Sequence, residues 1–232
     1  MCASNTFEYF VDGVFGGLLP ATNANLASVL PVTASTLSIV ICENTTVAIS
    51  SPLVVNATGC RVSIACADAS QTCAHDGGKA SQLLSAAAGS VSLAGLVLQN
   101  GFSATGGGAI AVAAGASVSV AGCVFQQDST SFAGGAVMDA GTFTAVASKF
   151  LQNTAQLGGA LYTVGGGIAV VNSTFLNNTA TTGGAVYDVG GNVSITGSNL
   201  AGNTAGGKGK KASDPFYNTT YIATTSDNIA LR

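Results

Sequence analysis

Two tyrosines and two aspartates in the second half of the chain have the types and spacing of a ligand-binding face. Tyr162 and Tyr187 occupy the same position in successive copies of the repeat described below, and Asp139 and Asp188 fall just after the same column. If one structural coil spans one repeat, the two rings lie on adjacent coils, and the two carboxylates lie about 9.6 Å apart, which is two strand spacings. Stacked aromatic rings beside carboxylates are typical of a sugar-binding groove, so Tyr162, Tyr187, Asp139 and Asp188 are the candidate carbohydrate-binding residues.

Asp139 and Asp188 also allow an alternative in which the face is catalytic. Their expected separation is at the upper edge of the range for the carboxylate pair of an inverting glycosidase. A structural explanation competes with both functions. Stacked tyrosines gain from cross-strand packing, aspartate before glycine is common in turns, and strict alternation would point the aspartates toward the core. The sequence leaves these alternatives open, and the catalytic role is the less favoured.

The six cysteines and the single histidine offer a second set of reactive groups. Cys42 and Cys66 are separated by nearly one repeat, so stacking of adjacent coils predicts a disulfide between them, with Cys66–Cys73 as the alternative. The chain has no Cys-x-x-Cys pair and only His75, so no metal or other cofactor is expected. His75 and Asp76 could do acid–base chemistry in a loop, but His-Asp-Gly-Gly is also a good turn sequence.

A repeat of about 25 residues must position these groups. One aromatic column contains Phe125, Phe150 and Phe175, and Gly-Gly-Ala recurs at 107–109, 134–136, 158–160 and 183–185. An amide column follows the aromatic one, and buried amides in such columns form structural hydrogen-bonded ladders. Its expected members are Asn100, Asn153, Asn178 and Asn203.

The segments within each repeat are short, rich in β-branched residues and flanked by glycine, as in strands. The sequence therefore predicts an all-β fold, a right-handed parallel β-helix (solenoid) of about seven coils with three strands and three turns per coil. Residues 36–207 form the β-helix, residues 1–35 form an amino-terminal capping segment, and residues 208–232 form a basic turn and an irregular tail.

Composition excludes several classes of protein. Hydrophobic residues make up 47% and charged residues only 7%, whereas an ordinary domain has roughly 25% charged residues. Seven basic residues are too few for phosphate contacts, so nucleic acid is not an expected partner. No run of 18 apolar residues occurs, so no transmembrane segment is expected.

The repeat resembles that of the chlamydial polymorphic outer-membrane proteins and of right-handed, pectin-lyase-like β-helix proteins on microbial surfaces. Phe-x-x-Asn followed by Gly-Gly-Ala and an aliphatic residue matches fully in the copies that begin at Phe150 and Phe175. The copy at Phe125 has Asp128 in place of the asparagine. The resemblance implies a secreted or surface-displayed β-helix that is adhesive or structural.

Features outside the repeat agree with an extracellular or cell-surface location. Residues 1–20 lack the basic segment of a signal peptide, so we expect the sequence to be part of a longer protein. Asn-x-Ser/Thr sequons, the acceptors of N-glycosylation, are meaningful only in a secretory context. The sequons are at Asn44, Asn56, Asn172, Asn177, Asn192 and Asn218.

The expected function is a non-catalytic secreted or surface module, with a polysaccharide or another surface protein as partner. A polysaccharide-degrading enzyme of pectin-lyase-like fold that uses Asp139 and Asp188 is the alternative. Binding to ice or another regular surface is a third hypothesis. It rests on the small outward residues of one strand column, which are Ser119, Thr144, Ala169 and Ser194.

Overall fold

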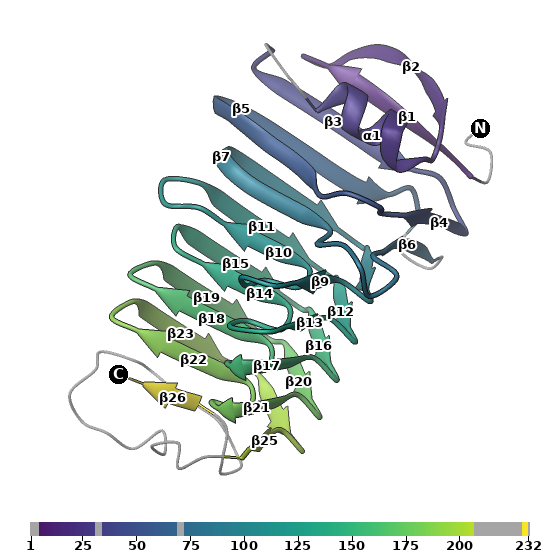
Figure 1. Cartoon of the computed structure of the whole chain (residues 1–232). Helices are drawn as coiled ribbons and strands as arrows, with labels where there is room; N and C mark the ends of the chain where they lie inside the picture. Colours follow the sequence, from purple (N-terminus) through teal and green to yellow (C-terminus); the bar gives the residue numbers. More distant parts are fainter. Residues whose placement is uncertain (1–4, 31–33, 69–71, 207–228, 232) are drawn as a thin grey trace.

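The computed structural model describes residues 5–30, 34–68, 72–206 and 229–231 of the chain. Its strands wind into a parallel β-solenoid of about seven coils that follow one another about every 25 residues. The coils stack along one axis from the amino-terminal hairpin to the carboxyl-terminal coil (Figure 1). The all-β, parallel β-helix fold predicted from the repeat is confirmed.

The amino-terminal end of the main sheet combines an antiparallel hairpin, a short helix and three parallel strands. These elements are β1 (Thr6–Val11), β2 (Val14–Pro20), α1 (Asn23–Val29), β3 (Thr36–Ile41), β5 (Leu53–Cys66) and β7 (Leu84–Ala94). The hairpin is joined to the solenoid because β1 pairs antiparallel with β3, with Phe7 opposite Ile41. Helix α1 begins where the Thr22 side chain accepts a hydrogen bond from the Asn25 backbone N–H (3.2 Å), which caps the first turn.

The main sheet divides into two branches after β7, because the first part of β7 pairs with β10 and its last part pairs with β11. One branch is β10 (Ile110–Val112), β14 (Val137–Asp139), β18 (Leu161–Val164), β22 (Val186–Val189) and β26 (Ile229–Leu231). The other branch is β11 (Ser117–Ala121), β15 (Thr142–Val146), β19 (Gly167–Val171) and β23 (Asn192–Thr196). Of the predicted basic turn and tail, residues 208–228 and 232 lie outside the described residues.

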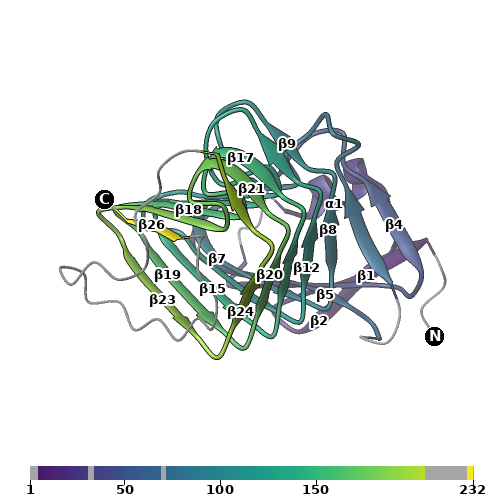
Figure 2. The same ribbon diagram turned by 90° about the horizontal axis from the view of Figure 1, so that it is seen from below.

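Two smaller parallel sheets complete the coils, one of seven strands that begins at β4 and one of five strands that begins only at β9 (Figure 2). The second sheet is β4 (Thr45–Ala48), β6 (Cys73–Asp76), β8 (Val97–Gln99), β12 (Val124–Gln126), β16 (Lys149–Leu151), β20 (Thr174–Leu176) and β24 (Asn199–Ala201). The third sheet is β9 (Phe102–Ser103), β13 (Ser129–Thr130), β17 (Thr154–Leu157), β21 (Thr179–Thr182) and β25 (Thr204–Ala205). The later coils thus have four strands, and the prediction of three was wrong. The added strands, such as β21 with the sequence Thr-Ala-Thr-Thr, are too short and polar to distinguish from turns by pattern.

The aromatic column forms the centre of the core. Phe125, Phe150 and Phe175 are fully buried. The Phe150 ring stacks on its two neighbours with centroids 4.8 Å and 4.6 Å away and planes 8° apart. The spacing equals the distance between neighbouring parallel strands, so the strand register itself produces the stack.

The amide column also forms, with one correction. Asn153, Asn178 and Asn203 hydrogen-bond from coil to coil, as predicted. Asn100 does not belong to this ladder, because Phe125 lies opposite Leu98 and Gln126 lies opposite Gln99. The prediction used Val97 as the start of that coil and was therefore shifted by one residue. Asn100 instead donates its amide to both carboxylate oxygens of Asp76, at 3.1 Å and 3.2 Å.

The corner between the main and second sheets requires a left-handed backbone in each of five successive coils. Glycine or asparagine, which tolerate this conformation best, fill the corner in four of them. The residues and their φ angles are Gly95 (64°), Gly122 (61°), Ala147 (49°), Asn172 (50°) and Gly197 (60°). Ala147 therefore sits in a conformation that is unfavourable for its side chain.

Ala147→Gly should raise the free energy of unfolding by about 1 kcal/mol, because glycine removes the left-handed penalty of an L-residue with a Cβ. Urea denaturation would measure the gain. Ala114→Gly is the matched control, since Ala114 is exposed and has no positive φ, and it should lose about 0.5 kcal/mol. A loss of stability in both variants would contradict the assignment of backbone strain to Ala147.

Candidate functional site

A groove of about 620 Å³ lies on the outer face of the main sheet. It runs across β3, β5, β7, β11 and β15, which follow one another from coil to coil. Its size falls within the range of small-molecule binding sites. The lining residues are Thr36, Leu37, Ser38, Arg61, Val62, Ser63, Ser90, Val91, Ser92, Ser117, Val118, Ser119, Thr142 and Thr144.

We call this surface the hydroxyl groove, because Ser and Thr are the most frequent of its lining residues. Strand alternation explains its composition. Each of the five strands contributes three consecutive residues at the groove, and the hydrophobic residue in the middle, such as Val118 or Phe143, is buried in the core. The residues on either side of it therefore face outward. Strand register then aligns the outward residues in two columns. One column is Thr36, Arg61, Ser90, Ser117 and Thr142, and the other is Ser38, Ser63, Ser92, Ser119 and Thr144.

Hydroxyl groups of adjacent coils are close enough to hydrogen-bond along these columns. Ser63 Oγ donates to Ser38 Oγ (3.0 Å), and Ser117 Oγ donates to Ser90 Oγ (2.9 Å). Each hydroxyl has one donor and two acceptor positions, so these contacts leave capacity for a ligand. The columns thus present hydroxyls at intervals of about 4.8 Å along the solenoid axis.

The groove carries little charge. Arg61 is its one charged lining residue, and the hydroxyls of Ser and Thr supply nearly all of its other side-chain polarity. None of its lining residues among those described is a histidine, cysteine or carboxylate. This set of groups can exchange hydrogen bonds with a polar ligand, and Arg61 can in addition pair with an anion.

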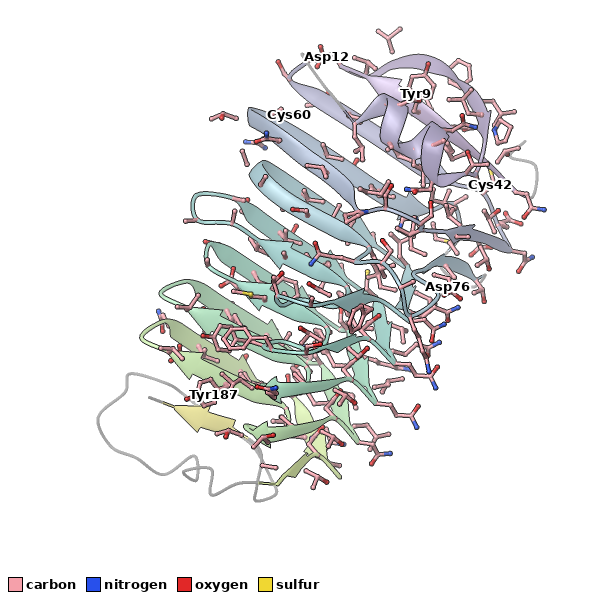
Figure 3. All side chains as sticks on the ribbon, in the orientation of Figure 1. Tyr9, Asp12, Cys42, Cys60, Asp76 and Tyr187 are labelled. Atoms are coloured by element: carbon pink, nitrogen blue, oxygen red, sulfur yellow. A yellow bond between two sulfur atoms is a disulfide. The ribbon has the colours of Figure 1, made fainter. Side chains whose placement is uncertain are left out.

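Tyr162 and Tyr187 stack as predicted, but they do not form an exposed groove. Their rings are nearly parallel, with centroids 5.9 Å apart and an interplanar angle of 3°. Each residue is only 6% exposed, because both belong to a small apolar cluster with Ala133, against which Leu157 also packs. The prediction of an exposed aromatic face was wrong. Alternation correctly gives the side of the sheet on which the tyrosines lie (Figure 3 labels Tyr187). It does not show that Leu157, at the end of β17 in the third sheet, packs against them there.

Asp139 and Asp188 point into the solenoid, as alternation indicated. Asp139 is fully buried and Asp188 is 1% exposed. The Asp139 carboxylate accepts hydrogen bonds from Gly141 N (3.1 Å) and Thr163 Oγ1 (3.3 Å), and Asp188 Oδ1 accepts one from Gly191 N (2.8 Å). Desolvation by burial raises the pKa of Asp139 to about 6 and also raises the pKa of Asp188. Both carboxylates stabilise turns within the fold, and neither lines the groove.

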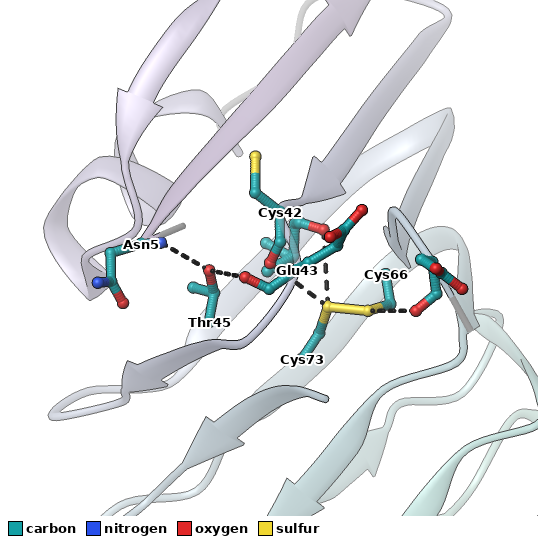
Figure 4. Close-up of a disulfide and its surroundings, with 8 residues drawn as sticks. Asn5, Cys42, Glu43, Thr45, Cys66 and Cys73 are labelled. Atoms are coloured by element: carbon teal, nitrogen blue, oxygen red, sulfur yellow. Dashed lines mark hydrogen bonds between the residues drawn. A yellow bond between two sulfur atoms is a disulfide. The ribbon is translucent and has the colours of Figure 1, made fainter. Parts of the chain in front are cut away.

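The disulfide connects Cys66 to Cys73, with their Cα atoms 5.6 Å apart (Figure 4). The alternative pairing is therefore confirmed and the pairing Cys42–Cys66 was wrong. The register of β3 and β5 places Cys66 opposite Ile41 and not opposite Cys42. Cys42 also takes part in a disulfide. Cys60 and Cys123 are the free cysteines among the described residues, and both are buried.

His75 and Asp76 do not form an acid–base pair, because they face opposite sides of β6. His75 is 3% exposed and lies in register with Val47 and Leu98, and its Nε2 has no hydrogen-bond partner. Asp76 faces outward and accepts hydrogen bonds from Gly78 N, Gln99 and Asn100. Burial lowers the pKa of His75 to about 4.

His75→Leu should therefore remove a loss of stability at acid pH. The unfolded chain takes up a proton near pH 6.5 and the folded chain only near pH 4, so acidification through this window costs about 3 kcal/mol. The stability difference between His75→Leu and the parent should grow by that amount from pH 7 to pH 4. Urea denaturation at both pH values would measure it. A difference that does not change with pH would contradict the burial of a neutral His75.

The remaining expectations concern the surface of the protein. The sequon asparagines among the described residues are all exposed, so an oligosaccharide could be attached to each without unfolding. They are Asn44, Asn56, Asn172, Asn177 and Asn192. Asn218 lies outside the described residues. Within the described part of the chain, no cluster of three His, Cys, Asp or Glu side chains could hold a metal ion, and no helix is long and apolar enough to span a membrane.

The hydroxyl groove could only partly be anticipated from the sequence. Ser119 and Thr144 were predicted to face outward, together with Ala169 and Ser194, which continue the same column on β19 and β23. The three upstream coils were missed. The missed signal is the recurrence of a hydroxyl residue two positions away from another, as in Thr36-x-Ser38, Ser90-x-Ser92 and Thr142-x-Thr144.

Comparisons with protein-family models, with curated proteins and with solved structures give no match to this chain. The likeness to the chlamydial repeat and to pectin-lyase-like proteins is therefore a likeness of short motifs. The functional argument must come from the groove itself.

Proposed function

We propose that this chain is a non-catalytic module of a secreted or cell-surface protein, and that it binds a linear polysaccharide along the hydroxyl groove. The observation that carries the proposal is the register of the two outward columns over five coils. A repeating row of donors and acceptors suits a repeating polymer of hydroxylated units that lies parallel to the solenoid axis. Because the surface is weakly charged, we expect binding to come from many weak hydrogen bonds and not from one strong ionic contact.

Several observations favour binding over turnover at this site. The groove has no carboxylate, histidine or cysteine among its described lining residues, and these are the usual acids, bases and nucleophiles of polysaccharide cleavage. Asp139 and Asp188, the pair considered for the pectin-lyase-like alternative, are buried and hydrogen-bonded inside the fold. The Cys66–Cys73 disulfide and the exposed sequons support an extracellular setting.

The first test is binding to a panel of neutral and acidic polysaccharides, with affinity electrophoresis for binding and mass spectrometry of the soluble phase for cleavage. Ser119→Glu places a bulky charge on the β11 part of the groove, and it should weaken binding at least about tenfold, or about 1.4 kcal/mol. Ser131→Glu is the matched control, because Ser131 is exposed and lies directly after β13 in the third sheet. Equal binding by both variants, or soluble oligosaccharide products, would contradict the proposal.

Binding to ice is the second candidate, and the paired hydroxyl columns favour it. Thr36-x-Ser38, Ser90-x-Ser92, Ser117-x-Ser119 and Thr142-x-Thr144 form a regular array. Arg61 interrupts that array in the second coil. Thermal hysteresis of the purified protein would support this candidate, particularly if Ser119→Glu abolishes it and Ser131→Glu does not. Absence of hysteresis together with polysaccharide binding would reject it.

A further inference from the structure

The amide ladder has one member that cannot donate a hydrogen bond if it is ionised. In the regular ladder, each asparagine Nδ2 donates to the Oδ1 of the next coil and to the carbonyl of the aromatic column in the previous coil. Asn178 Nδ2, for example, donates to Asn203 Oδ1 (2.8 Å) and to the Phe150 carbonyl (2.9 Å). Asn153 repeats the pattern toward Asn178 and Phe125.

Asp128 occupies the first position of this ladder and is fully buried. Its backbone N–H donates to Asn153 Oδ1 (2.9 Å), and its Oδ1 accepts a hydrogen bond from Gly101 N (2.7 Å), so the residue has the ladder geometry. Its Oδ2 takes the place of an amide nitrogen and has no hydrogen-bond partner.

An asparagine amide at this position would donate hydrogen bonds to two groups, and both of these groups are acceptors. The register places Leu98 in the aromatic column of the previous coil, so the equivalent acceptors are the Leu98 carbonyl and Asn153 Oδ1. An ionised carboxylate oxygen there would be buried facing acceptors, which is strongly unfavourable. A protonated carboxyl would instead donate one of the two missing hydrogen bonds.

Burial and a neighbouring carboxylate also favour the protonated form of Asp128, and the hydrogen bond from the Gly101 N–H opposes them. Burial raises the pKa of Asp128 well above the ordinary value for aspartate, and the negative charge of Asp76 raises it further. Asp76 is the titratable group that acts on it, and the adjoining ladder and turn contribute Asn153 and the backbone of Gly101.

We propose that Asp128 keeps its proton at neutral pH and serves as a hydrogen-bond donor in the ladder, which makes the contact between its coil and the next one sensitive to alkaline pH. When the carboxyl ionises, that donor is lost and a negative charge is left between acceptors. The coil that carries β11, β12 and β13 should then loosen before the all-asparagine coils that follow. This inference concerns the fold and stands apart from the proposed function.

The test compares pH profiles of unfolding in a background where two other buried acids are removed. Asp139→Asn/Asp188→Asn is that background, because both of these carboxyls also have raised pKa values. A proton held only by the folded state should increase the unfolding equilibrium constant about tenfold per pH unit above about pH 4, until Asp128 itself ionises. Adding Asp128→Asn should remove this contribution and increase stability most at high pH. The result is the difference between the two profiles, so the opposing titration of His75 cancels.

Asn178→Asp in the same background is the matched variant that places a second carboxyl in the ladder. It should add a second loss of stability with rising pH, of the same kind as that expected from Asp128. Identical pH slopes before and after Asp128→Asn would overturn the proposal. The infrared spectrum of the folded background protein at neutral pH gives an independent readout. It should show the carbonyl band of a buried protonated carboxyl, and absence of that band would overturn the proposal even if Asp128→Asn or Asn178→Asp fails to fold.

Discussion

Replacing Phe150 with alanine should lower the free energy of unfolding by about 4 kcal/mol, because it removes the middle ring of the aromatic stack. Phe150 is fully buried and contacts Phe125 and Phe175 at stacking distance on both sides. Truncation of a buried phenylalanine leaves a cavity that rigid neighbouring coils cannot fill, and such changes cost about 3–5 kcal/mol. Urea denaturation followed by circular dichroism would measure the loss.

Phe132→Ala is the matched control for this prediction. Phe132 is 44% exposed, and its ring centroid lies 6.3 Å from that of Tyr162 in a tilted arrangement. Its removal should cost less than about 1 kcal/mol, as for most surface substitutions. If Phe150→Ala were no more damaging than Phe132→Ala, the aromatic column could not be the centre of the core.

Asn178→Ala should also lower the free energy of unfolding by about 4 kcal/mol, because it breaks the amide ladder between two coils. The Asn178 side chain donates to Asn203 and to the Phe150 carbonyl, and it accepts hydrogen bonds from the N–H and the Nδ2 of Asn153. Alanine leaves these buried groups without partners, and each unsatisfied group costs about 1–3 kcal/mol. Denaturation in urea gives the magnitude.

The adjacent Asn177 provides the control for this substitution. It is exposed and has φ of 55°, a conformation that glycine adopts readily. Asn177→Gly should therefore change stability by less than about 0.5 kcal/mol. An equal loss in both variants would show that the ladder adds nothing beyond the local backbone.

Much of the fold could be predicted because the later repeats have equal length. Phe150 and Phe175 are one full repeat apart, so their columns align without any knowledge of the turns. The first regular coil is longer, with Phe125 opposite Leu98, and there the predicted alignment was off by one residue. An error of that size placed Asn100 in the ladder, whereas the structure has it beside Asp76.

The candidate site was harder to predict than the fold, for a physical reason. Alternation determines which face of a strand a side chain occupies, and it assigned Tyr187 and Asp188 to opposite faces. It does not determine what covers that face, and the third sheet buries the tyrosines under Leu157. The hydroxyl columns depend on the register of coils of unequal length, and the structure supplies that register.

The most direct test of the central claim, that the hydroxyl groove is the binding face, is solution NMR mapping of a bound oligosaccharide from the polysaccharide panel. Resonances of Ser92, Ser119 and Thr144 should shift on binding, while those of Tyr162 and Tyr187 should not. Shifts confined to the tyrosine cluster, or no saturable shift with any polysaccharide, would contradict the account.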